Sequence, residues 1–411
     1  MLEDSPKQSQ DHTMLKSQFN NIKIRVAILG NLCQVGYNFA KFLRRKGVNA
    51  HLFISSKEES TFVEDSDIDS TSSEYLHFVG NSNNLPTILN VYPVLKIYRG
   101  LRSRITTTRL IRLLRSFDLI HSLNGWNYFP PRVGKKYIAF TTGADMTEVA
   151  MSQTKYGKRM RKGFQQANLV MHGNLNQLPY FKKLDLNKTV FLPFPIDVNK
   201  YHPYHTDLSF GNFECVFFAP SSLDWTYKYL KQYYYGVERV SGKGNDRFLK
   251  AFARLLHEGY NALAILVYHG VDKEKTKQLV RALGIASNVR FIQKLRKNEM
   301  IQYYNASDVV VDQFDMGSHG LITLEAMSCA KPVIVSIRKE WELQCYPEPL
   351  PIINCRTENE IYRQLKLALK REYREKIGAQ AREWIMKYHH WEKVIDKLIR
   401  HYETILGRKI I

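Results

Sequence analysis

Cysteine is scarce in this sequence of 411 residues, and the five that occur are far apart. None forms a CxxC pair or joins a Cys/His cluster, which argues against a disulfide framework and against structural zinc. We therefore expect five reduced, buried thiols: Cys33, Cys215, Cys329, Cys345 and Cys355.

Long apolar runs are also missing. No stretch approaches the roughly 20 apolar residues that a membrane-spanning helix needs. Residues 1–22 are polar and lack the apolar segment of a signal peptide. We predict a disordered leader over residues 1–22, an acidic, serine-rich loop over 56–74, and a cytoplasmic, soluble protein.

Acidic residues are outnumbered, 39 to 60, and the net charge is +21. Such a surplus predicts an anionic partner. It is concentrated in two clusters, Arg99–Arg115 and Lys155–Lys162, the first interleaved with leucine and isoleucine. Basic amphipathic helices suit an anionic membrane surface, although a solvated basic face explains either cluster equally well. No zinc-finger or RRM-like signature accompanies the charge, so we place a membrane above nucleic acid and predict no nucleic-acid partner.

The length favours two domains, and the pattern of apolar runs agrees. Lys23–Gly30 and Ala50–Ile54 read as buried parallel strands around a helix at Tyr37–Lys46. Further strands are predicted in the first half over four ranges: Leu119–Ser122, Tyr137–Thr141, Leu169–His172 and Thr189–Leu192.

A second alternating series begins after the proline-containing stretch Phe194–Pro203. Its predicted strands are Cys215–Ala219, Ala262–Val267, Val289–Ile292, Val309–Asp312 and Pro332–Val335, with helices at Asp246–His257, Lys273–Leu283, Met300–Asn305 and Leu321–Ser328. The fold class is α/β with two doubly wound domains, and ligands are expected at the carboxyl ends of the strands. We assign residues 23–205 and 206–385 to the two domains, and 386–411 to a terminal helix that packs back toward the first.

The segment Asp312–Ser336 contains the strongest chemical signal. Glycines precede a helix beginning near Leu321, which lets backbone N–H groups approach a phosphate. Glu325 lies one turn inside that helix, where it can accept hydrogen bonds from ribose. Taken alone, the glycines favour a simple turn followed by a solvated helix glutamate. The whole segment, with LEAM at Leu324–Met327 followed by Pro332 and Val333, resembles the donor-binding signature of glycosyltransferase family four, also called glycosyl transferases group 1.

This resemblance implies the GT-B fold: two Rossmann-like domains facing a central cleft, closed by C-terminal helices. It gives Glu325 as the ribose ligand, and the amides of Gly320, Leu321 and Ile322 as contacts to the diphosphate or sugar. Gly317 stands where the family has a second, sugar-contacting glutamate, and marks a divergent branch.

Two other segments resemble the same family. Lys243-Gly244, before a helix, matches the lysine that binds donor phosphates. The family's upstream arginine is missing from Pro220–Trp225, and Arg239 is the available substitute. A lysine suits this task because fixed cations neutralise the leaving nucleoside diphosphate. The resemblance implies no metal and no cofactor.

In the first domain, Phe140–Asp145 resembles the glycine-aspartate loop that faces the donor sugar, and Asp118–His121 the strand that ends in histidine. Asp145 and His121 are therefore the candidate catalytic residues, although His121 is also compatible with a core position. Leu123 occupies the place of a further family histidine. Gly36 is expected beneath the diphosphate, which would explain the absent side chain.

We therefore expect a retaining, metal-independent glycosyltransferase that uses a UDP- or GDP-linked sugar. Its acceptor would be a glycan or lipid-linked molecule in surface polysaccharide synthesis, handled at the inner face of the membrane. A same-fold nucleotide-sugar epimerase, a degenerate sugar-nucleotide-binding protein and a charge-driven nucleic-acid binder remain alternatives.

Overall fold

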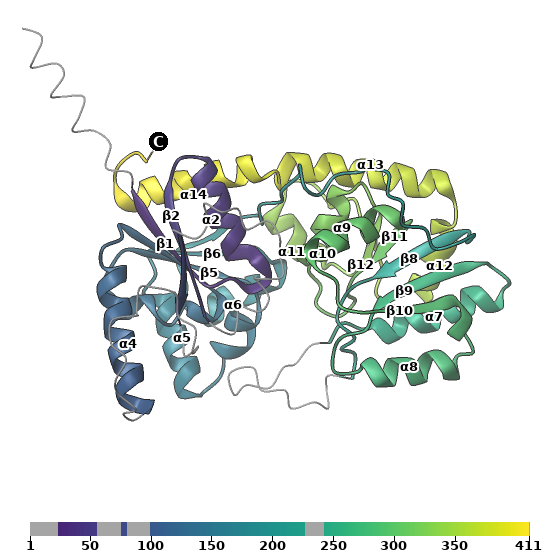
Figure 1. The fold of residues 1–411 in the computed structure, drawn as a ribbon, viewed down its shortest axis with the longest axis horizontal. Helices are drawn as coiled ribbons and strands as arrows, with labels where there is room; N and C mark the ends of the chain where they lie inside the picture. The colour runs from purple at the N-terminus through teal and green to yellow at the C-terminus, as the bar shows by residue number, and fades with distance from the viewer. Residues whose placement is uncertain (1–23, 56–74, 80–98, 227–241, 411) are drawn as a thin grey trace, which may run out of the picture.

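The computed structural model describes residues 24–55, 75–79, 99–226 and 242–410. The expected leader, the acidic loop over 56–74 and Arg239 lie outside these ranges. The described residues form two α/β domains side by side, with the last two helices running along both (Figure 1).

The N-terminal domain contains a seven-stranded, fully parallel sheet in the order β3-β2-β1-β4-β5-β6-β7. Its strands are β1 (Arg25–Leu29), β2 (Asn49–Ser55), β3 (Leu76–Val79), β4 (Leu119–Leu123), β5 (Tyr137–Thr141), β6 (Leu169–His172) and β7 (Thr189–Phe191). Its helices are α2 (Val35–Arg45), α4 (Arg99–Leu114), α5 (Lys155–Gln165) and α6 (Leu178–Lys183). β4 and β5 are buried at every position, as expected for strands covered on both faces.

The C-terminal domain contains a six-stranded parallel sheet in the order β10-β9-β8-β11-β12-β13. Its strands are β8 (Cys215–Ala219), β9 (Ala262–Val267), β10 (Val289–Ile292), β11 (Val309–Val311), β12 (Val333–Val335) and β13 (Ile353–Asn354). Its helices are α7 (Asn245–His257), α8 (Lys273–Ala282), α9 (Lys297–Ala306), α10 (Leu321–Ser328), α11 (Lys339–Cys345), α12 (Glu358–Ala368) and α13 (Arg371–Tyr388). The predicted fold class and both strand series are confirmed.

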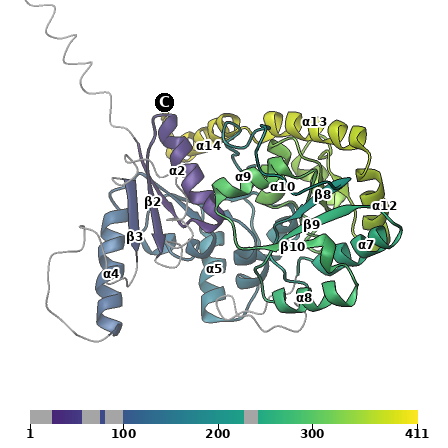
Figure 2. The ribbon, with the colours of Figure 1, turned by 45° about the vertical axis from the view of Figure 1, so that its right-hand side comes forward.

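The last helix, α14 (Trp391–Leu406), crosses back to the N-terminal domain and lies against α2 (Figure 1). The ring of Trp391 stacks on Phe42 with centroids 4.8 Å apart, and Lys46 pairs with Asp396 at 2.9 Å. Figure 2 shows that α2 lies on the side of its domain next to α9 and α10. The fold thus places the loop between β1 and α2 opposite the loops of the second sheet.

The cysteines only partly match the expectation. All five are free thiols, but only three are buried, namely Cys215, Cys329 and Cys355. Cys345 is half-buried, and Cys33 is exposed because it lies in the loop between β1 and α2 rather than in a strand or helix core.

Candidate functional site between the two domains

The loop from β11 to α10 is held by a buried carboxylate at its start. Asp312 accepts hydrogen bonds from Ser221 at 2.5 Å and from Thr323 in the first turn of α10 at 2.7 Å. The side-chain amide of Gln313 donates to the carbonyl of Ser318 at 2.8 Å. These contacts join the loops after β8 and β11, which end at the same edge of the sheet.

The N-terminus of α10 offers unused backbone donors. Gly320 is the N-cap residue and supplies no capping side chain. Within the described part of the chain, the N–H groups of Leu321 and Ile322 have no acceptor. Both residues are half-buried, so the end of the helix is reachable. Free N–H groups and the helix dipole together favour an anion such as a phosphate.

Lys243 lies beside this helix end. Its backbone carbonyl accepts from the N–H of Phe314 at 2.8 Å, which ties it to the β11–α10 loop. Its ammonium group donates to the side-chain carbonyl of Gln313 and lies 3.6 Å from the sulfur of Met316. A cation is thereby fixed next to the amides of α10, the combination needed to bind a diphosphate.

Glu325 is nearly fully buried and pairs with a residue that the sequence analysis missed. Its Oε1 is 2.5 Å from the ammonium of Lys297, and its Oε2 accepts from the hydroxyl of Tyr304 at 3.1 Å. Lys297 is the first residue of α9, which begins three residues before the predicted helix start at Met300. The carboxylate is thus oriented by two partners before any ligand arrives.

The loop between β1 and α2 faces this cluster from the other domain. Cys33 lies close enough to Lys243, Lys297 and Glu325 for their charges to act on its thiol. Although Cys33 as a residue is exposed, the protein atoms around its thiol keep water away from the sulfur and raise its pKa, and the two lysines oppose that rise. Cys33 and Gln34 both adopt left-handed backbone conformations, with φ of 51° and 63°. Adjacent strained residues of this kind concentrate at ligand-binding loops.

At two positions, Gly36 and Gly317, the structure gives a different reason for the glycine from the one expected. A Cβ at Gly36 would lie 1.9 Å from the carbonyl oxygen of Gly30, so backbone packing of α2, rather than room for a diphosphate, explains the missing side chain. Gly317 has φ of +65°, and a Cβ there would lie 2.8 Å from Arg338. The backbone of this loop is therefore built for glycine, and a glutamate would need a different loop.

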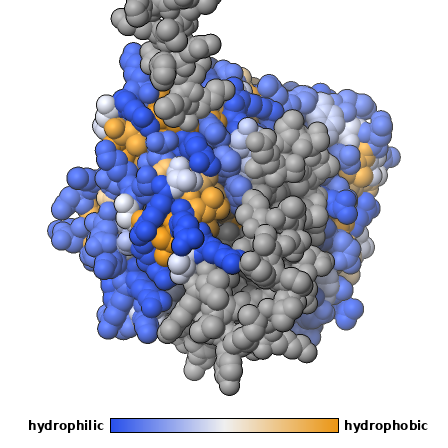
Figure 3. Space-filling view, turned by 60° about the vertical axis from the view of Figure 1, so that its left-hand side comes forward, coloured by the Kyte–Doolittle hydropathy of each residue, from blue (hydrophilic) through white to orange (hydrophobic). Residues whose placement is uncertain are grey.

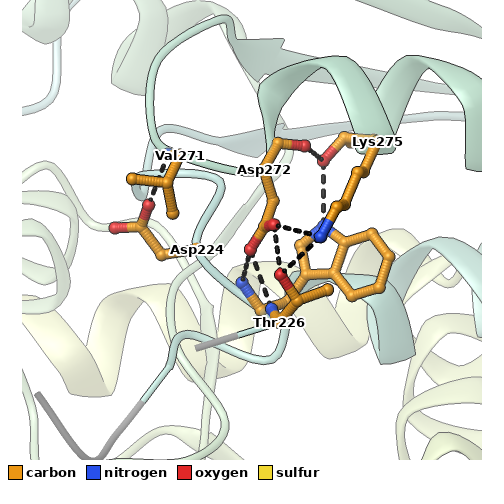
Figure 4. Close-up of polar contacts among 7 residues, drawn as sticks. Asp224, Thr226, Val271, Asp272 and Lys275 are labelled. Atoms are coloured by element: carbon orange, nitrogen blue, oxygen red, sulfur yellow. Dashed lines mark hydrogen bonds and ion pairs between the residues drawn. The ribbon is translucent and has the colours of Figure 1, made fainter. Parts of the chain in front are cut away.

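Two buried carboxylates join the loops after β8 and β9 in the C-terminal domain (Figure 4). Asp272, fully buried, accepts from the backbone N–H and hydroxyl of Thr226, and lies 3.5 Å from the ammonium of Lys275. Asp224 accepts from the N–H of Val271 at 2.8 Å. Burial alone would raise the pKa of Asp272, but the hydrogen bonds from Thr226 and Trp225 and the charge of Lys275 together outweigh it, and the pKa is lowered. The loops after β8 and β9 are locked together in this way.

Asp145 lies in the N-terminal domain, at the start of a π-helical turn over Asp145–Val149. Its carboxylate is buried and accepts from Thr141 at 2.8 Å, Asn127 at 3.0 Å and the N–H of Gly143 at 3.1 Å. Burial raises its pKa to about 6, against the effect of these hydrogen bonds. The side chain therefore holds the loop after β5 in shape and ties it to Asn127 in the loop after β4.

His121 lies on the other face of the same sheet, under the last helix. Its Nδ1 is 2.6 Å from the hydroxyl of Tyr402 on α14, and its ring packs against Phe39. The residue is fully buried, and burial lowers the pKa of its imidazole to about 3. The structure places His121 among the contacts that attach α14, apart from the cluster around Glu325 and Lys243.

The structure therefore brings Glu325, Lys243, Gly320, Leu321 and Ile322 to one edge of the C-terminal domain, with the loop before α2 facing them. Gly36 lies in the first turn of α2. The structure leaves Asp145 and His121 inside the N-terminal domain.

Comparison with known proteins agrees with this geometry. Residues 231–340 match the family described as Glycosyl transferases group 1. This segment is similar to that family over about a quarter of the chain. It contains Lys243, Gly317 and Glu325.

Among curated relatives, the D-inositol 3-phosphate glycosyltransferase of Corynebacterium jeikeium is 32% identical over 101 residues. That match covers 23% of this chain and 24% of the relative, so the chain matches about a quarter of the length of such relatives. Several solved structures match nearly the whole chain, among them the following two. HepE of Anabaena, solved with UDP and glucose, gives a TM-score of 0.67 at 13% identity, covering 92% of this chain and 99% of that one. Sucrose-phosphate synthase of Thermosynechococcus elongatus gives 0.62 at 14%, covering 94% and 100%. These structures show that the fold is GT-B.

The residues missed by the sequence analysis share one signal. Lys297 and its exposed neighbour Lys294 follow the end of strand β10, and that loop opens at the same sheet edge as the others. A position just beyond a parallel strand would have been enough to nominate them.

Proposed function

We propose that this chain is a retaining, metal-independent glycosyltransferase that transfers a sugar from a UDP- or GDP-linked donor. One observation carries the proposal: the free N–H groups at the start of α10 lie between a fixed cation, Lys243, and a buried carboxylate, Glu325. The amides and Lys243 suit a diphosphate, and Glu325 suits the ribose hydroxyls.

In the mechanism that we propose, the donor domain stabilises the departing nucleoside diphosphate. Negative charge grows on the leaving phosphate as the glycosidic bond breaks, and preorganised donors stabilise it without reorganisation. Lys243 and the amides of Leu321 and Ile322 supply these donors. We assign no enzymic nucleophile, and we propose Asp145 as a positioning residue of the loop that faces the sugar.

For the acceptor we propose a glycan or a lipid-linked molecule of surface polysaccharide synthesis, met at the cytoplasmic face of a membrane. The support is the charge of the N-terminal domain: α4 and α5 contain no acidic residue. Basic helices attract anionic lipid surfaces by about 1 kcal/mol per residue close to the surface. Over the described ranges, no helix has both the length and the hydropathy to cross a bilayer.

A non-catalytic sugar-nucleotide binder is the second candidate. It is favoured by Gly317 and Leu123, which stand where the family has a glutamate and a histidine. The test is incubation with a panel of UDP- and GDP-sugars, following donor hydrolysis and transfer. Release of the nucleoside diphosphate from one donor, abolished by Glu325→Ala, would support the enzyme. Tight donor binding without any turnover would favour the binder.

A further inference from the structure

A second hollow lies away from the cleft, on the N-terminal domain between α4, α5 and the loop after β4. It encloses about 680 Å³. Its polar lining consists of Thr107, Thr108, Tyr128, Arg132, Arg159 and Lys162. Figure 3 shows the side of the molecule nearest to α4: the surface there is largely hydrophilic, with a small hydrophobic area beside a hollow.

The lining combines three cations and no carboxylate. Arg159 and Lys162 are three residues apart and so share one face of α5. Within the ranges that the structure describes, neither they nor Arg132 form an ion pair with an acidic side chain. Arg161 on the same helix shows the contrast, because its guanidinium donates to the carbonyls of Ala150 and Ser152 at 2.6 and 2.9 Å. Arg161 has a structural task, whereas Arg132, Arg159 and Lys162 are exposed side chains that line the hollow.

Hydroxyl groups add further hydrogen-bond donors to the lining of the pocket. Thr107 and Thr108 contribute two hydroxyls from α4, and Tyr128 contributes a third from the loop after β4. The tyrosine is held in place, since its ring lies against Tyr156 with centroids 5.2 Å apart, and Tyr156 donates to the carbonyl of Gly125 at 2.8 Å. Converging cations and hydroxyls match the oxygens of a phosphate group, which accepts several charge-assisted hydrogen bonds at once.

The place of the pocket in the fold suggests which molecule carries that phosphate. The pocket lies in the N-terminal domain, between the middle of α4, the loop after β4, and the middle and second half of α5. The donor residues lie in the other domain. We propose that this pocket binds a phosphate group of the acceptor substrate. Its assignment to the acceptor rests on the proposed function, but phosphate binding by the pocket does not.

The experiment compares two double variants of α5 with equal charge. Arg159→Ala/Lys162→Ala removes pocket cations, and Lys155→Ala/Lys158→Ala removes two exposed cations of the same helix that do not line the pocket. The probes are glycerol 3-phosphate in solution, followed by NMR titration with UDP present to occupy the cleft, and vesicles of phosphatidylcholine with or without phosphatidic acid. Glycerol and pure phosphatidylcholine are the uncharged controls.

We expect the pocket variant to lose affinity for the phosphate probe by about 100-fold, or roughly tenfold for each charge-assisted contact, while the control variant loses little. Loss for glycerol 3-phosphate supports a soluble phosphorylated acceptor, and loss for phosphatidic acid vesicles alone supports a lipid-borne one. Equal weakening in both variants, or no binding of either probe by the wild type, would overturn the proposal.

Titration of UDP without the phosphate probes separates this result from the proposed function. If UDP does not bind, but the pocket variant has a lower affinity for glycerol 3-phosphate than the wild type, the proposed transferase function is wrong and the phosphate site is supported. If UDP binds all variants equally and neither phosphate probe binds the wild type, the pocket fails and the donor site stands.

Discussion

The two domains use their charged residues in different ways. In the C-terminal domain, Lys243 lies in the loop before α7 and pairs with Gln313 after β11, and Glu325 lies in α10 and pairs with Lys297 of α9. In the N-terminal domain, Asp145 and His121 are fully enclosed. Asp145 has its partners in the loops after β4 and β5, and His121 has its partner on α14. The difference indicates that the donor side is prebuilt by side chains, whereas the candidate residues of the other side shape backbone and attach a helix.

The largest expected effect comes from Glu325, which tests whether the C-terminal domain binds the nucleotide through this residue. Glu325→Ala should weaken binding of the cognate nucleoside diphosphate by about 1.5–3 kcal/mol, because a hydrogen bond to a charged group is lost. Calorimetric titration measures the affinity, and circular dichroism reports the fold. Glu340→Ala is the control, since Glu340 is an exposed glutamate of α11 in the same domain. Unchanged affinity in Glu325→Ala would remove Glu325 from the site.

A variant of Lys243 distinguishes binding of the phosphates from binding of the nucleoside. Lys243→Ala should lower the affinity for UDP or GDP by about tenfold or more, because one charge-assisted phosphate contact is lost. The affinity for the free nucleoside should hardly change. Lys250→Ala, on α7 beside Asp246, controls for the change of net charge. Equal weakening of nucleotide and nucleoside would mean that Lys243 only supports the loop.

His121 tests the other side of the comparison. His121→Phe leaves the buried hydroxyl of Tyr402 without its partner, so unfolding in urea should show a loss of about 1–3 kcal/mol. The double variant His121→Phe/Tyr402→Phe should recover part of that loss, because both polar groups are gone. Donor affinity should not change. A folded His121→Phe protein that binds donor normally but transfers no sugar would instead place His121 in catalysis.

The smallest effect is a pH dependence from Asp145. Its pKa is raised to about 6 in the folded protein from an ordinary value of 3.8, so the folded state keeps the proton over a range where the unfolded chain has released it. The stability that this group contributes is present below pH 4 and is lost as pH rises to 6. The difference in unfolding free energy between wild type and Asp145→Asn should therefore shrink from pH 4 to pH 6. A constant difference would contradict the raised pKa.

Sequence patterns located most of the fold, because runs such as Cys215–Ala219 are apolar throughout and are bounded by turn residues. β13, with only two residues, gave too short a pattern to be recognised. The proposed donor site could be nominated from the sequence where one contiguous segment carries it, as from Gly317 to Glu325. The pairing of Glu325 with Lys297 and Tyr304, and of Lys243 with Gln313, could not, since contacts between separate segments leave no spacing rule in the sequence. Nor could spacing show that Asp145 and His121 are enclosed, which depends on what packs over them.

A crystal structure with UDP, and separately with GDP, tests the central claim most directly. We predict that one of the two nucleotides lies with its diphosphate at the N-terminus of α10, within hydrogen-bond distance of Lys243, and with its ribose on Glu325. A nucleotide bound elsewhere, or the absence of both from the cleft at saturating concentration, would contradict the account.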